Sequence, residues 1–125
     1  MERFTVRSDD LGVESIDNDM LVIDFATNHY YCLNSTAATI WSMLAAAPGS
    51  LDEIATRVAG SYDRPLDDLR SDVEVLVVAL ADEGLLTTRD EPAAAPVVEP
   101  EVDGSWIVPR FEKFGTLDQL MLAGE

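Results

Sequence analysis

Two residues with catalytic side chains, His29 and Cys32, lie three positions apart in the segment HYYCL of this 125-residue sequence. A cysteine nucleophile needs an activating base, usually held in place by a third polar group. If the segment is extended, residues three apart point to opposite faces, so His29 does not lie beside Cys32. We therefore interpret Cys32 as a small hydrophobic residue in a strand and not as a nucleophile.

Other catalytic patterns are not found in the sequence. It has no glycine-rich phosphate loop, no His and Cys cluster with metal-ligand spacing, and no Ser-His-Asp set. Its 24 acidic residues are scattered over expected turns and helix surfaces, where carboxylates are usually solvated. These features favour a binding protein without catalytic activity, cofactor or metal over a small enzyme.

The composition restricts the class of partner. The formal net charge of −16 disfavours binding to nucleic acid and to anionic membranes. The hydrophobic content of 47% is sufficient for one core, and no signal peptide or long apolar run is evident. A single cysteine excludes an internal disulfide. We therefore expect a cytoplasmic protein.

The residues of the HYYCL segment are expected to form the last strand of a small antiparallel sheet. Segments 13–16 and 20–25 flank the turn-forming Asp17-Asn18-Asp19, and Thr27-Asn28 forms the next turn. The aromatic segment His29–Leu33 is then a third strand, and residues 3–7 are a further weak strand candidate. An exposed strand edge must be covered or used. We expect this edge to bind an extended peptide through His29, Tyr30, Tyr31, Cys32 and Leu33.

Three helices are expected after the sheet. Asn34 or Ser35 can cap the first, which ends near Ala47, and the Ser-x-x-Glu capping box at Ser50 opens the second. Gly60 is expected to end the second helix, Pro65 to open the third, and Gly84 to end it. Residues 85–88 then form one more short strand. The predicted core faces, read from three-four spacing, are Ala37, Ile40, Trp41 and Leu44; Leu51, Ile54, Ala55 and Val58; and Leu66, Leu69, Val73, Leu76 and Leu80.

A second apolar set on the third helix, Val75, Val78 and Ala79, lies outside its core stripe. One interpretation is a helix buried over a wide arc, as core helices often are. The other is the partly exposed wall of a groove that faces the bound peptide. Periodicity does not separate these alternatives.

The chain is divided by composition into a domain at 1–88, a linker at 89–104 and a tail at 105–125. The linker is rich in Pro, Ala and Glu, which predicts an extended, semi-rigid segment. In the tail, residues 106–111 suit an extended segment, Gly115 is a break, and a capping box at Thr116 opens a short helix with Leu117, Leu120 and Met121 on one face. So many apolar residues predict a tail that docks on a protein surface, with Trp106 and Phe111 as anchors.

The domain resembles the PqqD-like family of peptide-recognition elements, which serve pathways that modify ribosomally made peptides. The resemblance lies in the order and spacing of YYCLN, STAATIW, SLDEIA and LADEGLL between residues 13 and 86. It implies an α+β fold, a small winged helix-turn-helix with a three-stranded antiparallel sheet and three helices. In that family the leader of a precursor peptide adds as a strand to the third strand and packs against the third helix.

The tail resembles the leader peptides of lasso-type precursors. The matching residues are an aromatic, a proline three later, an apolar residue two after that, and a glycine four further on: Trp106, Pro109, Phe111 and Gly115. The family prefers Tyr and Leu at the positions of Trp106 and Phe111, and it has Thr where this chain has Met121. Because no core peptide follows in the sequence, we interpret the tail as a built-in leader mimic.

Two main functions remain for comparison. The first is a peptide chaperone that binds a precursor leader and presents it to a modifying enzyme, such as a leader protease or cyclase. Its own tail competes in cis or enters a second copy to give an exchanged homodimer. The second is a winged-helix transcriptional regulator. The expected third helix disfavours DNA binding, because Arg70 is its one basic residue against Asp67, Asp68, Asp72, Glu74 and Asp82, with Glu83 at its end.

Overall fold

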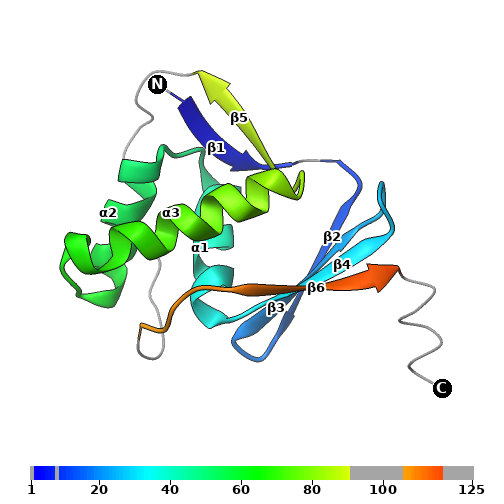
Figure 1. The fold of residues 1–125 in the computed structure, drawn as a ribbon, viewed down its shortest axis with the longest axis horizontal. Helices are drawn as coiled ribbons and strands as arrows, with labels where there is room; N and C mark the ends of the chain where they lie inside the picture. Colours follow the sequence, from blue (N-terminus) through cyan, green and yellow to red (C-terminus); the bar gives the residue numbers. More distant parts are fainter. Residues whose placement is uncertain (1, 8, 91–105, 117–125) are drawn as a thin grey trace.

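The computed structural model describes residues 2–7, 9–90 and 106–116, and within them the fold is α+β. The helices are α1 (Ser35–Ala46), α2 (Leu51–Tyr62) and α3 (Leu66–Asp82). The strands are β1 (Glu2–Val6), β2 (Leu11–Ile16), β3 (Asp19–Asp24), β4 (His29–Leu33), β5 (Leu86–Asp90) and β6 (Phe111–Thr116). Figure 1 shows the helices and the β1–β5 ribbon on one side of the molecule, with the larger sheet on the other.

The larger sheet is antiparallel and has the order β2-β3-β4-β6. The prediction of a three-stranded sheet is therefore wrong by one strand, because β6 from the tail pairs with the free side of β4 (Figure 1). The meander itself is confirmed, with Asp17 and Asn28 in the left-handed conformation that tight turns favour. A separate two-stranded ribbon pairs β1 with β5. The strands predicted near residues 3–7 and 85–88 are therefore also confirmed.

Two predicted helix starts are confirmed by hydrogen bonds. The Ala37 amide donates to Asn34 Oδ1 at 3.1 Å, and Ser50 with Glu53 forms a complete capping box. The predicted end of α2 at Gly60 is wrong. The helix continues to Tyr62, and the left-handed backbone of the next residue, Asp63, supplies the helix stop that a glycine usually provides. The third helix ends just before Gly84, the predicted stop, and Gly84 has a positive φ of 78°.

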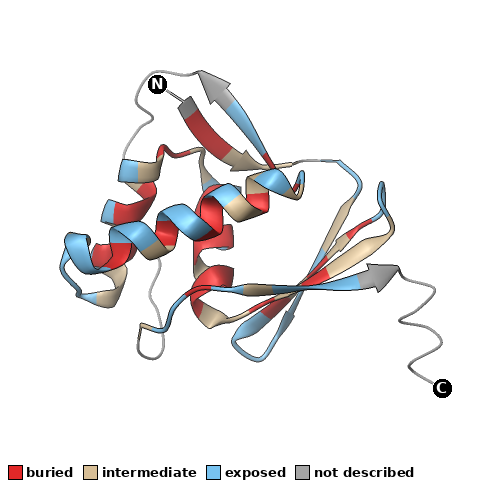
Figure 2. Cartoon of the chain, viewed as in Figure 1, coloured by how far each residue is buried: buried red, intermediate tan, exposed pale blue. Residues whose placement is uncertain are grey.

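The core lies between the three helices and one face of the sheet. Figure 2 shows the buried residues concentrated on the facing sides of the helices and on the part of the sheet beside α1. Most predicted core positions are buried, whereas Leu51 and Leu66 are half-buried. On β4, Tyr31 and Leu33 are 1% and 0% exposed, so alternate residues of the predicted edge strand face the core.

The boundaries predicted for the second half of the chain need correction. β5 extends to Asp90, two residues into the predicted linker, and residues 91–105 lie outside the described residues. In the tail the strand is Phe111–Thr116, whereas the sequence predicted an extended segment over residues 106–111 and a break at Gly115. Pairing with β4 resumes at Thr116, and the register shifts at Gly115, which is an unpaired bulge residue and not the end of the strand. The helix predicted from Thr116, with Leu117, Leu120 and Met121, lies outside the described residues, apart from Thr116 itself, which ends β6.

Candidate functional site

The edge of β4 is the first element of the candidate site. All five of its residues are paired with β6, from Leu33 opposite Phe111 to His29 opposite Thr116. The register shifts between Tyr30 and His29, because Gly115 is an additional residue on the β6 side. Such a one-residue bulge bends a strand and often ends its pairing. The tail thus supplies the sixth strand of the described chain. It pairs with the edge of β4, and the paired residues Leu33 and Phe111 are 78 positions apart in the sequence.

The direction of each β4 backbone group follows from one hydrogen bond. The Asn34 amide donates to the Arg110 carbonyl at 3.1 Å, so the Asn34 backbone N–H faces the tail. Backbone groups alternate in direction along a strand. The N–H groups of Cys32 and Tyr30 therefore also face β6, and those of Tyr31 and Leu33 face β3.

Asn34 holds the tail on both sides of Pro109. Its side-chain Nδ2 donates to the Val108 carbonyl at 2.9 Å, and its Oδ1 accepts from the Arg110 amide at 3.2 Å. The same Oδ1 accepts from Ala37 at the start of α1. A proline has no N–H to donate, and Pro109 itself is buried. Asn34 thus joins the helix cap to the backbone that flanks the proline.

Aromatic contacts occur on both faces of the β4–β6 pair. On the core face, the Phe111 ring lies edge-on to Tyr31 with centroids 5.9 Å apart, and Phe111 packs against the hydrophobic core. On the outer face, Phe114 stacks on Tyr30 at 4.9 Å and is 37% exposed. Before the strand, Trp106 contacts the Tyr62 ring edge-on at 5.2 Å, and it also packs against the core. Trp106 and Phe111 therefore make the deeper contacts.

A charged contact links β6 to the end of α3. Lys113 Nζ lies 2.7 Å from Glu83 Oε1, and the buried Tyr31 hydroxyl donates to the same oxygen at 3.2 Å. The hydrogen bond from Lys113 is the main reason that the pKa of Glu83 is lowered, and the Tyr31 hydroxyl adds to it. Burial, with Glu83 beside it, raises the pKa of Tyr31 to about 12, so the hydroxyl keeps its proton and remains a donor.

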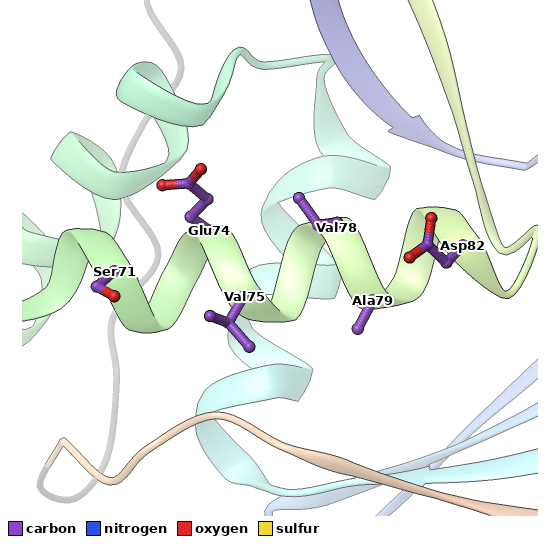
Figure 3. A pocket seen from close by; sticks show the side chains of 6 residues that line it. All are labelled: Ser71, Glu74, Val75, Val78, Ala79 and Asp82. Atoms are coloured by element: carbon purple, nitrogen blue, oxygen red, sulfur yellow. The ribbon is translucent and has the colours of Figure 1, made fainter.

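The second apolar set on α3, Val75, Val78 and Ala79, lines a separate groove. The groove has a volume of about 510 Å³ and is lined by Ser71, Glu74, Val75, Val78, Ala79 and Asp82. Figure 3 shows two adjacent rows along α3, with Ser71, Val75 and Ala79 in one and Glu74, Val78 and Asp82 in the other. Val75 and Val78 are 67% and 43% exposed with β6 in place, so the wide buried arc is the wrong alternative.

The structure does not favour nucleophilic chemistry at Cys32. Its thiol is half-buried, and burial followed by the nearby Asp19 and Glu112 raises its pKa, which disfavours the thiolate. Among the described residues, no group of three or more His, Cys, Asp or Glu side chains is arranged to hold a metal ion. None of the helices in residues 2–90 is long and apolar enough to cross a membrane.

The predicted site residues fall into three groups. The five β4 residues pair with β6, in which Phe111 lies opposite Leu33 and Gly115 is the bulge residue, and Pro109 and Trp106 precede the strand. Val75, Val78 and Ala79 lie on the open groove of α3, and Leu117 and Leu120 lie outside the described residues. Asn34, Tyr62 and Glu83 were missed as tail contacts. Asn34 was identified as a helix cap, but no periodicity marks a capping side chain as a contact with a distant segment.

The chain is similar to one protein family and to two solved structures. The family model described as coenzyme PQQ synthesis protein D (PqqD) matches residues 19–86. The solved structure of TbiB1 in complex with the TbiA(beta) leader peptide has a TM-score of 0.58 and 24% identity, over 66% of this chain and 93% of that one. Lasso peptide synthetase B1 complexed with the leader peptide has a TM-score of 0.57 and 27% identity, over 67% of this chain and 96% of that one. Curated protein sequences give no match.

Proposed function

Because the chain belongs to the PqqD family, we propose that it is a non-catalytic chaperone for the leader of a ribosomally made precursor peptide. The leader adds as a strand along β4, in the winged helix-turn-helix arrangement of the family. The bound precursor is then presented to a modifying enzyme, such as a leader protease or a cyclase. Backbone hydrogen bonds supply most of the affinity in this mode of binding, and side-chain pockets supply the selectivity.

The single observation that carries the proposal is the pairing of β4 with β6. An extended segment distant in sequence already occupies the edge, and the β4 backbone groups that face it are the ones a peptide needs. Two similar structures contain a protein in complex with a leader peptide, which supports a leader as the ligand of this chain. The exposed Val75 and Val78 then offer apolar surface for another part of the peptide.

The tail acts as a leader mimic in this proposal. Trp106, Pro109, Phe111 and Gly115 have the spacing of a lasso-type leader, and the last two lie on β6 itself. A tail on the same chain has an effective concentration of about millimolar order, so even a weak segment occupies the edge for most of the time. A client leader must therefore displace β6, and the edge is covered when no client is present.

Deletion of residues 105–125 tests this proposal. The truncated protein is expected to bind a lasso-type leader peptide at least about tenfold more tightly than the full chain, because intramolecular competition is removed. Calorimetric titration of one peptide into both proteins measures the difference. A synthetic peptide of residues 105–116, added to the truncated protein, should compete with that leader.

Two results contradict the proposal in different ways. If truncation leaves the affinity unchanged or lowers it, the tail is not a competitor, and a docking handle for the modifying enzyme becomes the better interpretation. If neither protein binds any leader peptide, strand capture at β4 is excluded. The sedimentation of the full chain should be measured beside the titration, because an exchanged dimer would place the tail in the edge of a second copy.

DNA binding is the less favoured function. The exposed positions of α3 include Asp67, Asp68, Glu74 and Asp82, and these carboxylates repel a phosphate backbone. A gel-shift measurement with the full chain is expected to show no complex at physiological salt.

A further inference from the structure

The contact between Lys113 and Glu83 indicates a selectivity rule for the peptide that occupies β4. We propose that Glu83, held in place by Tyr31, selects a basic side chain two residues after the apolar residue that anchors the peptide. The inference rests on the proposed function, since it concerns which peptides the β4 edge accepts. In the tail these two positions are occupied by Phe111 as the anchor and Lys113 as the basic residue.

The strand register determines which tail side chains lie on the same face as Leu33 and Tyr31. Phe111 lies opposite Leu33 and Lys113 opposite Tyr31, and both β4 partners face the core. Side chains two apart on a strand share a face, so a peptide that inserts its anchor beside Leu33 must direct its second residue after the anchor toward Tyr31. The intervening residue, Glu112, lies opposite Cys32 and points to the other face. The rule therefore applies to one position and not to its neighbour.

Glu83 is held in a fixed position. Its backbone caps the end of α3, where its amide donates to the Ala79 carbonyl at 3.1 Å. Its carboxylate accepts from the Tyr31 hydroxyl, and the Tyr31 side chain is itself buried. A hydrogen bond from a buried side chain limits the freedom of the carboxylate, which reduces the entropy lost when a cation is bound.

The local charge favours a basic side chain. Glu83 follows the last residue of α3, and the carboxyl end of a helix favours a nearby cation. The lowered pKa of Glu83 means that the carboxylate is charged at neutral pH. A peptide with Lys or Arg at this position gains an ion pair, whereas one with Asp or Glu places a second anion beside a carboxylate that cannot move away easily.

The test uses the full chain, with its own tail as the peptide, and amide hydrogen exchange as the measurement. The Cys32 amide faces β6 and reports tail docking, while the Tyr31 amide faces β3 and reports the stability of the domain. Lys113→Glu and Glu83→Lys are each expected to lower protection at Cys32 by about threefold to tenfold, because an ion pair becomes a repulsive pair. Protection at Tyr31 should stay the same.

The charge swap and three matched controls complete the test. The double variant Glu83→Lys, Lys113→Glu should restore Cys32 protection to within about twofold of the original, because attraction is regained with the signs reversed. Lys113→Arg should keep protection, and Tyr31→Phe should weaken the effect of Lys113→Glu by releasing the carboxylate. Glu112→Lys, on the opposite face, should have the same effect whichever residue occupies position 83.

Two outcomes contradict the inference, and they differ in what they mean for the proposed function. If the two single variants keep the original protection at Cys32, or if the swap restores nothing, Glu83 does not select a basic residue and the inference is overturned. Strand addition at β4 still stands in that case. If the Cys32 amide of the unmodified chain exchanges as an open amide does, β6 does not dock, and the proposed function fails together with the inference.

Discussion

The two strands beside β4 differ far more in their side chains than in their backbones. β3 and β6 each pair with all five residues of β4. On β3, Met20, Val22 and Asp24 are buried, whereas the β6 residues from Glu112 to Phe114 are exposed and Phe111 is half-buried. A tight turn at Asn28 joins β3 directly to β4, whereas β6 lies far from β4 in the sequence.

This difference separates a structural strand from a replaceable one. β3 contributes to the core, and its apolar burial stabilises the whole domain at about 25 cal/mol per Å². β6 contributes backbone pairing and a few side-chain contacts. Most of its described side chains are exposed to solvent. A strand of the second kind fills little of the core, so it can leave and another peptide can take its place.

Truncation of one buried β3 side chain should destabilise the whole domain. Val22 is 0% exposed, so Val22→Ala is expected to lower the free energy of unfolding by about 2 kcal/mol. Phe111→Ala in β6 should leave that free energy nearly unchanged and lower Cys32 protection instead. Urea denaturation followed by circular dichroism measures the first quantity.

Val13→Ala is the matched control for the β3 variant. Val13 lies opposite Val22 on β2 but is 49% exposed, so the cost should stay below about 0.5 kcal/mol. Equal losses of stability for Val22→Ala and Phe111→Ala would mean that β6 is as structural as β3.

Removal of one backbone donor from β6 should release the tail while the domain stays folded. Glu112 lies opposite Cys32, whose N–H faces β6, so the Glu112 N–H faces β4. Glu112→Pro removes that donor and leaves a Cys32 carbonyl unpaired, so docking should weaken by about tenfold or more. The measurement is exchange at the Cys32 amide relative to the Tyr31 amide.

Proline one position later provides the control. The Lys113 N–H points away from β4, so Lys113→Pro should weaken docking no more than Lys113→Ala does. A larger loss from Lys113→Pro than from Glu112→Pro would show that the assigned backbone directions are reversed.

Asn34→Asp should separate the two roles of Asn34. An aspartate keeps an acceptor for Ala37 at the helix start, but it lacks the Nδ2–H that donates to the Val108 carbonyl. The free energy of unfolding should change little, because an anion is favourable at a helix start, while tail docking should fall by about fivefold. Asn34→Ala should also lower the free energy of unfolding, by about 1 kcal/mol. A tail docked equally well in Asn34→Asp would limit the role of Asn34 to capping.

The sequence predicted local structure well and the tail geometry less well. Three features that depend on neighbouring residues are confirmed. They are the limits of β4 at His29 and Leu33, the capping box at Ser50 and the core stripe of α3. The end of α2 was misplaced because an aspartate can adopt the left-handed conformation that is more common for glycine. The predicted break at Gly115 is a bulge within β6, because the strand resumes pairing at Thr116 with a segment that is distant in the sequence.

The missed contacts have a similar cause. Glu83 is one of several acidic residues near the end of α3, and nothing in its sequence neighbourhood distinguishes it from Asp82. Its role depends on the register that places Lys113 opposite Tyr31, and register is set by the three-dimensional pairing. In contrast, Val75 and Val78 were identified as a second apolar set, and only their exposure required the structure.

The smallest expected effect is a dependence of tail docking on pH. The pKa of Glu83 is lowered chiefly by Lys113, so the docked state prefers the ionised carboxylate. The stabilisation is therefore fully present above the ordinary carboxyl pKa and is lost as pH falls through the lower value of the docked state. Because both side chains are partly exposed, docking should weaken by only about twofold to threefold across that range. Exchange at the Cys32 amide at several acidic pH values, corrected for intrinsic rates, measures this loss of docking.

In Glu83→Gln the pH dependence should disappear, since a glutamine still accepts from Tyr31 but does not titrate. An unchanged pH profile in that variant would assign the effect to another carboxylate and leave Glu83 with a structural role at the end of α3.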